Sequence, residues 1–194
     1  MSKRIIFATG NENKMKEIRQ VFHDLDYEIL SMKEAGIELE VEETGSTFEE
    51  NALLKAAAIA KQCDDIVLAD DSGLEIDYLN KEPGIYSARY LGHDTSYDYK
   101  NKKILEKLAD VPRQQRSARF VCAIAAVFPD GHSVVERATI EGEIGFEIAG
   151  EGGFGYDPIF YVPEYGCTTA QLSPEQKNEI SHRGKALRMI RKAL

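Results

Sequence analysis

The sequence has few cysteines and no tryptophan. Its 194 residues include three cysteines, Cys63, Cys122 and Cys167, which lie far apart along the chain. An odd number of widely spaced cysteines indicates neither a disulfide framework nor a zinc site. We therefore expect three buried or inert thiols.

Long hydrophobic runs are also missing. The N-terminus passes almost at once into the apolar run 4–8, which is too short for the core of a signal peptide. No uninterrupted apolar stretch is long enough to span a bilayer. The sequence therefore predicts a cytoplasmic protein that does not bind a membrane.

An excess of positive charge is absent as well. The formal net charge is -9 at pH 7, from 24 Lys and Arg against 33 Asp and Glu. Broad binding to nucleic-acid phosphates normally needs a basic face, so nucleic acid is not expected as a partner. A small polyphosphate is still compatible with this charge, because a divalent cation can bridge carboxylates to phosphates while a few basic side chains complete the pocket.

What the sequence does contain is an alternation of short strands and amphipathic helices. Its length and its 43% hydrophobic content allow one domain over residues 1–194 with one substantial core. This alternation predicts an α/β fold with a mixed sheet. Strands are expected at 4–8, 27–30, 66–69, 118–128 and 134–144, and helices at about 15–25, 48–62, 97–108 and from 173 through the tail to 194.

The first candidate segment for chemistry is the turn between the first strand and the first helix, Thr9-Gly10-Asn11-Glu12-Asn13-Lys14. Free backbone N–H groups at a helix start favour phosphate, so this turn is a candidate cradle for a triphosphate. It is not a Walker loop, because that glycine spacing and the terminal Gly-Lys-Ser/Thr are missing. Simple capping of the helix by Thr9 and Asn11 explains the same residues.

Two adjacent carboxylates, Asp70 and Asp71, follow the apolar run 66–69. They repel one another and lose hydration unless a cation, donors or water compensate them. Neighbouring side chains on a regular strand point to opposite faces, so only one faces a ligand unless the strand has already ended. A turn at Asp71-Ser72-Gly73 is the competing interpretation, and the local pattern does not decide between them.

An acidic run, Glu38, Glu40, Glu42 and Glu43, precedes Thr44-Gly45. A solvated loop is the usual explanation of such a run. The functional alternative is that one of these carboxylates is an oxygen ligand for magnesium, which prefers one or two carboxylates together with phosphate oxygens and water. The residues alone do not choose among the four.

The glycine-rich stretch 150–155 formally matches a dinucleotide-binding pattern, but the segment after it is extended where that motif requires a helix. Exposed Phe154 and Tyr156 in a flexible loop are instead candidates to stack on a base, with an aromatic-packed turn as the alternative. Further along, Ser181 can cap a helix whose first residues, His182 and Arg183, are donors for carbonyl oxygens of a base. Structural roles for both donors are the alternative.

Together these segments resemble the inosine/xanthosine triphosphate pyrophosphatase family, whose members remove deaminated purine nucleotides before they enter DNA or RNA. They occur in the family's order and cover nearly the entire chain. The matching segments are Thr9 to Lys14, Glu42-Glu43-Thr44-Gly45-Ser46-Thr47-Phe48, Asn51 to Lys55, Ala69-Asp70-Asp71-Ser72-Gly73, Pro83-Gly84-Ile85-Tyr86-Ser87-Ala88-Arg89, Gly153-Phe154-Gly155-Tyr156-Asp157-Pro158 and Ser181-His182-Arg183.

The resemblance implies an elongated α/β protein with two lobes, a central mixed sheet flanked by helices, a substrate cleft between the lobes, and a homodimer. It implies Mg²⁺ held by Glu42 and Asp71, with Asp71 as the essential catalytic carboxylate, and it places Lys55 in the substrate site. In our hypothesis of the mechanism, Asp70 and Lys55 are added as catalytic residues, with Asp71 or its neighbour Asp70 positioning or deprotonating the attacking water. The substrate-binding residues that it implies are Thr9, Gly10, Asn11, Glu12, Asn13, Lys14, Ser72, Phe154, Gly155, Tyr156, Asp157, Lys177, His182 and Arg183.

The expected reaction is attack of water on the α-phosphorus of ITP, dITP or XTP, which releases pyrophosphate and a monophosphate. Lys14 and Lys55 are expected to balance charge on the leaving pyrophosphate. Phe154 is expected to stack on the purine, while His182 and Arg183 donate to its 6-oxo group. Two alternatives stay open: a pyrophosphatase for pyrimidine or modified nucleotides, as in the septum-formation inhibitor family, and a nucleotide sensor that does not hydrolyse.

Overall fold

The computed structural model describes residues 3–194, and its seven strands form one sheet in the order β2-β1-β3-β4-β5-β6-β7. The strands are β1 (Lys3–Phe7), β2 (Tyr27–Ser31), β3 (Ile66–Ile76), β4 (Ser117–Val127), β5 (Ser133–Ile144), β6 (Phe160–Val162) and β7 (Cys167–Thr168). The helices are α1 (Glu12–Val21), α2 (Phe48–Ala60), α3 (Tyr97–Lys107), α4 (Pro174–Ile180) and α5 (His182–Ile190). Within residues 3–194, every helix is too short or too polar to cross a lipid bilayer.

Both parallel and antiparallel pairs occur in the sheet. β1 lies parallel to β2 and to β3, with Ile5 opposite both Ile29 and Ile66. β6 lies antiparallel to β5 and to β7, with Val162 opposite Cys167. The predicted α/β class with a mixed sheet is therefore confirmed.

The chain divides into two compact units. Among the described residues, the first unit comprises 3–71, 122–138 and 182–194, and the second comprises 72–121 and 139–181. The strands β3, β4 and β5 contribute residues to both units. The elongated shape and the cleft between lobes stay predictions.

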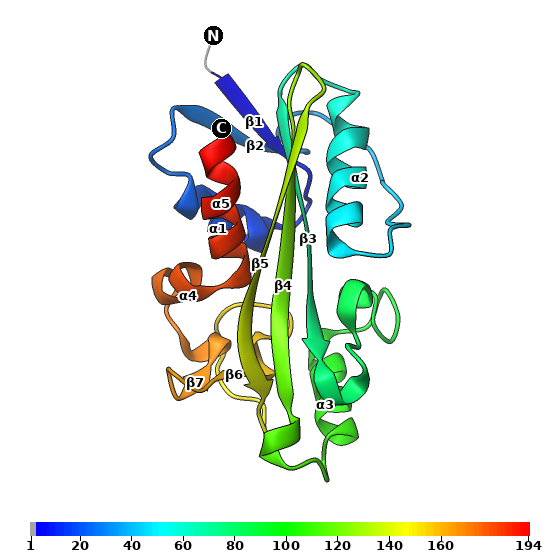
Figure 1. Cartoon of the computed structure of the whole chain (residues 1–194), viewed down its shortest axis with the longest axis vertical. Coiled ribbons are helices and arrows are strands. Elements are labelled where there is room, and N and C mark those ends of the chain that lie inside the picture. Colours follow the sequence, from blue (N-terminus) through cyan, green and yellow to red (C-terminus); the bar gives the residue numbers. More distant parts are fainter. Residues whose placement is uncertain (1–2) are drawn as a thin grey trace. The chain divides into compact units, whose positions relative to one another are not determined.

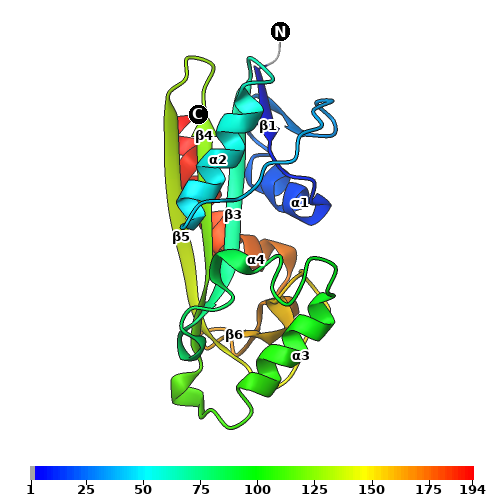
Figure 2. The same cartoon turned by 90° about the vertical axis from the view of Figure 1, so that its right-hand side faces the viewer.

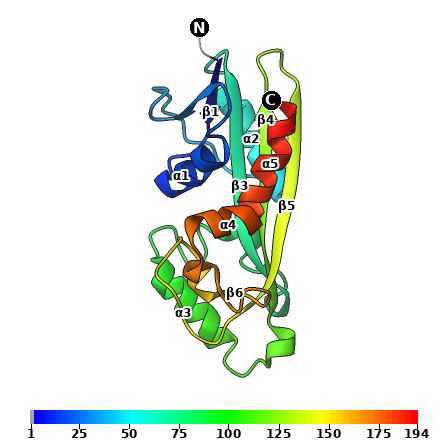
Figure 3. The same ribbon diagram turned by 90° about the vertical axis from the view of Figure 1, so that its left-hand side faces the viewer.

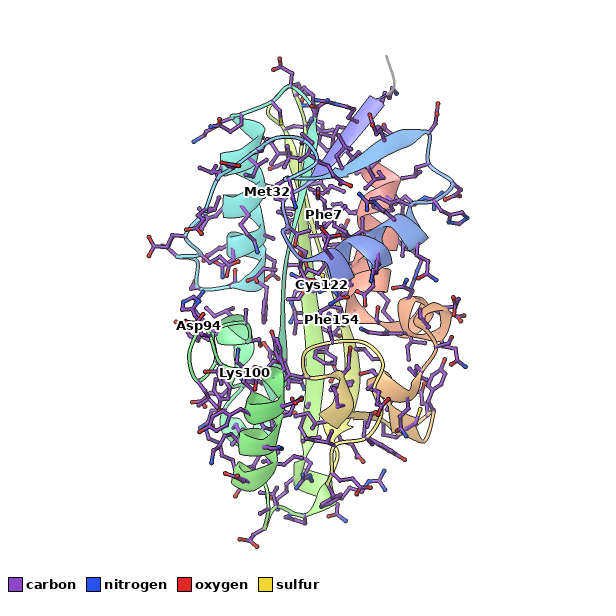
Figure 4. All side chains as sticks on the ribbon, turned by 180° about the vertical axis from the view of Figure 1, so that it is seen from behind. Phe7, Met32, Asp94, Lys100, Cys122 and Phe154 are labelled. Atoms are coloured by element: carbon purple, nitrogen blue, oxygen red, sulfur yellow. The ribbon has the colours of Figure 1, made fainter. Side chains whose placement is uncertain are left out.

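In the first unit, helices cover both faces of the strands. Figure 1 shows α1 and α5 on one face and α2 on the other, with α2 in front of the strands in Figure 2 and α5 in front of them in Figure 3. Phe7 and Cys122, both labelled in Figure 4, belong to the apolar core on the α1 and α5 face. The other buried members of this core are Ile5, Met15, Ile18, Phe22, Leu68, Ile124, Ala126, Ala138, Ala186, Leu187 and Ile190.

Capping residues fix where the first two helices begin. The side chain of Asn11 accepts hydrogen bonds from the backbone N–H groups of Asn13 and Lys14, and Thr47 accepts from the N–H of Glu50. Such caps satisfy N–H groups that have no partner within the helix. The capping predicted for Asn11 is confirmed, and α2 matches the helix predicted over 48–62.

In the second unit, α3 packs beside the loop that carries Phe154. The ring of Tyr97 on α3 meets the ring of Tyr156 edge to face, with centroids 5.1 Å apart, and the side-chain amide of Asn101 donates to the carbonyl of Gly155 over 3.1 Å. The buried apolar core of this unit is formed by Leu74, Ile76, Ile104, Leu108, Val111, Ala118, Phe120, Ile140, Ile144, Tyr156, Ile159, Phe160 and Val162.

The strand predicted at 66–69 is longer than expected. β3 continues to Ile76, so Asp70 and Asp71 lie within a strand, and the alternative turn at Asp71-Ser72-Gly73 is wrong. The reason is that Leu74 and Ile76 are fully buried, so the apolar alternation resumes beyond the polar residues.

The tail is not one helix. α4 ends at Ile180, and the extended backbone of Ser181 (φ -67°, ψ 155°) separates it from α5. Ser173 and Gln176 form a capping box at the start of α4. His182 and Arg183 therefore lie in the first turn of a separate helix, as the functional interpretation of this segment requires.

Candidate active site

Asp70 and Asp71 point to opposite faces of β3. Asp70 contacts Lys14 of α1 and Arg183 of α5, whereas Asp71 contacts Asn51 of α2. Successive side chains alternate across a strand, and this strand has not ended at the pair. The two carboxylates therefore belong to two different environments within the first unit.

Asp70 is a buried anchor for two cations. Its carboxylate lies 2.9 Å from the ammonium of Lys14, and both Nε and Nη2 of Arg183 donate to its Oδ2 over 3.3 Å. Burial opposes ionisation, but the charges of Lys14 and Arg183 outweigh it and hold the pKa of Asp70 well below its usual range. Asp70 is thus a carboxylate at every physiological pH.

Arg183 is itself enclosed by acidic partners. Its side chain is 3% exposed, and Nη1 donates to Oε2 of Glu17 over 2.5 Å. Burial lowers the pKa of Arg183, but the charges of Asp70 and Glu17 raise it above the ordinary arginine value. The predicted base-reading arginine is therefore fixed in position by carboxylates from β3 and α1.

The charge of Asp71 is less compensated by neighbouring cations than the charge of Asp70. Oδ2 of Asp71 accepts a hydrogen bond from Nδ2 of Asn51 over 3.1 Å, and its Oδ1 lies 3.9 Å from the ammonium of Lys55. Burial raises the pKa of Asp71 to about 6, with the charge of Glu43 adding to the effect and Lys55 opposing it. A carboxylate held in this way has the proton affinity of a group that can accept a proton near neutral pH.

In the acidic loop, Glu43 pairs with Lys55, the same lysine that lies near Asp71. Oε1 of Glu43 lies 2.6 Å from the ammonium of Lys55, and its charge acts on Asp71. Glu42 is exposed. Burial lowers the pKa of Lys55, but the charges of Asp70, Asp71 and Glu43 have the larger, opposite effect. The pKa of Lys55 is therefore raised above its ordinary value, and Lys55 stays charged.

The predicted phosphate loop borders a cavity of about 680 Å³. Thr9 is buried, and its Oγ1 accepts a hydrogen bond from the backbone N–H of Asn11. Gly10, Asn11, Glu12 and Asn13 are exposed. The cavity, of a size typical for small ligands, is lined by Gly10, Met32, Lys33, Gly36, Ile37, Glu38, Leu39 and Glu40; Met32 is labelled in Figure 4.

In the second unit, Asp157 and Lys177 hold Phe154. Asp157 is buried, and its Oδ2 accepts from the backbone N–H of Phe154 over 2.9 Å and from Nζ of Lys177 over 2.7 Å. The same ammonium lies 4.6 Å from the centre of the Phe154 ring. Gly153 has φ +67°, and a Cβ at this position would collide with the Asp157 carboxylate. The half-buried Phe154 is labelled in Figure 4.

The expectation that Tyr156 is exposed is wrong. Its side chain is 4% exposed and its hydroxyl donates to the carbonyl of Ser87 over 2.7 Å. The ring packs against Tyr97 of α3. The aromatic-packed turn, which the sequence offered as an alternative, is therefore correct for Tyr156.

The remaining predicted residues fall in both units. Ser72 lies half-buried in β3, directly after Asp71, and His182 is buried at the start of α5. Sequence reasoning did not assign roles to Asn51 and Asn101, which hold Asp71 and Gly155. The spacing of Asn51 and Lys55, one helical turn apart on α2, is the signal that could have identified Asn51.

Residues 3–194 hold no group of three or more His, Cys, Asp or Glu side chains arranged to bind a metal ion. Asp71 and Glu43 nevertheless offer carboxylate oxygens that both interact with Lys55. Magnesium usually takes only one or two protein carboxylates and completes its shell with phosphate oxygens and water. The donor chemistry of this pair therefore fits magnesium.

Comparisons with known proteins extend over nearly the whole chain. A model of the Ham1 family matches residues 5–193. A dITP/XTP pyrophosphatase of Clostridium perfringens is 47% identical, over 97% of this chain and 96% of that protein. The structure of the Staphylococcus aureus Ham1 protein matches with a TM-score of 0.87 and 47% identity, over 98% of this chain and 97% of that one. A HAM1 protein from Coxiella burnetii matches with a TM-score of 0.89 and 41% identity, over 98% of each chain. With the family model and these relatives in agreement, the chain belongs to the Ham1 family.

Proposed function

We propose that this chain hydrolyses deaminated purine nucleoside triphosphates, ITP, dITP and XTP, to the monophosphate and pyrophosphate, and so keeps them out of DNA and RNA. The relative from Clostridium perfringens carries the name dITP/XTP pyrophosphatase. The observation that carries the proposal is the buried Asp71, which contacts Asn51 and lies near the cation of Lys55. A carboxylate in this setting can serve both metal binding and proton transfer.

We propose Mg²⁺ as the cofactor, with Asp71 and Glu43 as its protein ligands. Glu42 is the ligand that the family resemblance implied, but the contact between Glu43 and Lys55 favours its neighbour. When bound, Mg²⁺ neutralises phosphate oxygens and orients them for attack. The two carboxylates supply its oxygen ligands, and Lys55 limits their mutual repulsion.

Asp71 is proposed to orient the attacking water and to accept its proton. In the metal-free protein, burial raises the pKa of Asp71 to about 6; bound Mg²⁺ would lower it, so the carboxylate is then ionised and available as an acceptor. Lys55 on α2 and Lys14 in the phosphate loop supply positive charge as pyrophosphate leaves. The exposed start of α1 is proposed to hold the phosphates through the positive end of the helix dipole and those backbone N–H groups that the side chains of Thr9 and Asn11 do not already bind.

Asp70 receives a different role from the one expected. The sequence placed it among the catalytic residues, whereas its contacts support an anchoring role. Two cations, Lys14 and Arg183, share its carboxylate. We propose that Asp70 sets the positions of both and leaves the reaction itself to Asp71.

Base recognition is proposed to use Phe154 as a stacking surface and His182 with Arg183 as donors to the 6-oxo group. Asp157 and Lys177 hold Phe154 through its N–H group and its ring, while Asp70 and Glu17 hold Arg183. Adenine presents an amino donor where hypoxanthine has an oxygen. Each mismatched buried donor costs about 1–3 kcal/mol.

A substrate panel tests the activity. With Mg²⁺, we expect kcat/KM for ITP, dITP and XTP to exceed that for ATP by about 100-fold or more, because two donors are left unpaired by adenine. Release of pyrophosphate and monophosphate is measured together for each nucleotide. Equal turnover of ATP and ITP would refute the discrimination, and nucleotide binding without pyrophosphate release would favour a sensor.

Phe154→Ala tests the stacking role. We expect the variant to raise KM for ITP about 10-fold or more, because stacking of a base on an aromatic ring contributes about 1–3 kcal/mol. Phe154→Tyr keeps the ring and serves as the control, with a KM close to that of the wild type. A wild-type KM in Phe154→Ala would show that the base binds elsewhere.

The assembly and location are proposed in line with the family resemblance. We propose a homodimer, a cytoplasmic location, and a single nucleoside triphosphate pyrophosphatase domain over residues 1–194. Sedimentation of the purified chain measures the first of these directly.

A further inference from the structure

We infer that Asn51 is a positioning residue that holds the Asp71 carboxylate and the loop carrying Glu43 in one arrangement. This inference rests on the proposed function, which assigns these two carboxylates to Mg²⁺. Asn51 receives no function in that proposal, although it contacts Asp71. Its side chain nonetheless connects the two segments from which the carboxylates come.

The first observation is a pair of hydrogen bonds made by one buried amide. Asn51 on α2 is 0% exposed. Its Nδ2 donates to Oδ2 of Asp71 over 3.1 Å, and its Oδ1 accepts from the backbone N–H of Gly45 over 2.8 Å. Because a backbone N–H can only donate, Oδ1 must face Gly45, and the amino group must therefore face Asp71.

The second observation is the tight approach of the loop to this amide. A Cβ added to Gly45 would lie 2.7 Å from Oδ1 of Asn51 and 2.7 Å from Cβ of Glu50. Only glycine permits the backbone to come this close. Gly45 lies two residues after Glu43, so the hydrogen bond fixes the loop beside the second carboxylate.

The third observation is the spacing of contacts along α2. Lys55, one turn after Asn51, binds Glu43 over 2.6 Å and lies 3.9 Å from Asp71. Residues four apart project from the same face of a helix. One face of α2 therefore contacts Asp71 and the Glu43 loop through two residues. Lys55 acts by charge on both carboxylates, and Asn51 forms hydrogen bonds with the Asp71 carboxylate and with the backbone of Gly45.

The hydrogen bond from the Asn51 amide fixes the orientation of the Asp71 carboxylate, whereas the charge of Lys55 does not. A carboxylate near an ammonium can rotate about its terminal bond, whereas one that accepts from a fixed N–H is oriented. Partners that orient metal ligands typically change metal affinity or activity 10–100-fold when they are removed. Asn51 is placed to have this effect on Asp71.

Binding of Mg²⁺ alone, without nucleotide, tests the inference by calorimetric titration of the whole chain. We expect Asn51→Ala to weaken Mg²⁺ binding about 10–100-fold. In the pyrophosphatase assay, the half-saturating Mg²⁺ concentration should rise by a similar factor, while KM for ITP at saturating Mg²⁺ changes little. An unchanged Mg²⁺ affinity in a folded Asn51→Ala would overturn the inference.

Glu50→Ala is the matched control. Glu50 holds the same loop by accepting from the N–H and the hydroxyl of Ser46, over 2.7 and 2.8 Å. It precedes Asn51 on α2 but its side chain binds Ser46 instead of Asp71, so its substitution should lower the melting temperature and weaken Mg²⁺ binding much less than Asn51→Ala does. If Glu50→Ala weakens Mg²⁺ binding as much as Asn51→Ala, the effect is general loosening and the inference fails.

A double-mutant cycle separates positioning from packing. In an Asp71→Ala background, the further change Asn51→Ala should cost less Mg²⁺ affinity than it does in the wild type, because only the contact of Asn51 with Gly45 is then left to lose. Additive losses would overturn the inference. If Asn51→Ala does not fold, Gly45→Ala replaces it as the test. The added methyl group collides with Oδ1 of Asn51 and should also weaken Mg²⁺ binding. A wild-type Mg²⁺ affinity in Gly45→Ala counts against the inference.

The wild-type protein distinguishes the two proposals. If it releases pyrophosphate with Mg²⁺ and Asn51→Ala binds Mg²⁺ equally well, the positioning role fails and the proposed function stands. If the wild type binds Mg²⁺ but does not release pyrophosphate, the proposed activity fails while the titrations still decide the role of Asn51.

Discussion

Asp71→Asn is expected to lower kcat for ITP by about 10³-fold or more while the protein stays folded. The substitution keeps the shape of the side chain but removes the charge that would bind Mg²⁺ and accept the proton of water. Proton transfer by a positioned group typically contributes 10²–10⁴-fold, and loss of a metal ligand adds to this. Steady-state pyrophosphate release at saturating Mg²⁺ measures the effect, and undiminished kcat would exclude Asp71 from the reaction.

The metal-free Asp71→Asn variant should be at least as stable as the wild type. Burial raises the pKa of Asp71 to about 6, above the unfolded value. For a carboxyl group whose pKa is raised by folding, the stability contribution is present below the unfolded pKa and is lost as pH rises through about 6. An uncharged amide avoids this loss. Melting temperatures at pH 7.5 without Mg²⁺ test the expectation, and a large decrease in the variant would contradict it.

Asp70→Asn, one residue earlier, is expected to destabilise the fold by about 3–5 kcal/mol. Removing one partner of a buried ion pair leaves the other charge without compensation. Here the substitution removes the carboxylate that pairs with Lys14 and one of the two carboxylates that pair with Arg183, whose side chain is 3% exposed; Glu17 is the other. Urea denaturation monitored by circular dichroism gives the free energy of unfolding for both proteins.

Asp65→Asn is the control for Asp70→Asn. Asp65 pairs with Arg4, whose side chain is 45% exposed. An exposed pair of this kind contributes little to stability, so the control should unfold at nearly the wild-type urea concentration. Equal stability of Asp70→Asn and the wild type would show that Lys14 and Arg183 do not depend on this carboxylate.

The secondary structure of the first half followed from the sequence because it depends on local signals. The face of α2 repeats at helical spacing after the Thr47 cap, and the structure places this helix at Phe48–Ala60. The alternation rule also gave two possible arrangements for Asp70 and Asp71. What the sequence did not show is that β3 continues, because a serine and a glycine interrupt the apolar pattern before Leu74 resumes it.

The choice between Glu42 and Glu43 was beyond the sequence for a physical reason. The loop that carries them has no periodicity, so nothing local determines which carboxylate turns inward. The ion pair with Lys55 favours Glu43, and this contact joins residues 12 positions apart. A long-range contact of this kind is decided by tertiary packing.

The aromatic loop shows the same limit. Phe154 and Tyr156 are both aromatic residues in one glycine-rich loop, and we predicted from the sequence that both rings are exposed. Their difference comes from the contacts of Tyr156 with Tyr97 and Ser87 in the second unit. The alternation of a strand does not apply to this loop, so exposure could not be inferred from spacing.

The adjacency of Asp70 and Asp71 has a mechanical consequence. Consecutive Cα atoms are about 3.8 Å apart across a rigid trans peptide. The residue that binds Lys14 of the phosphate loop and the residue held by Asn51 are thus joined by a single peptide unit. A displacement of β3 along its axis carries both Cα atoms by the same amount, so the spacing between these two backbone positions is insensitive to repacking of the helices on either face.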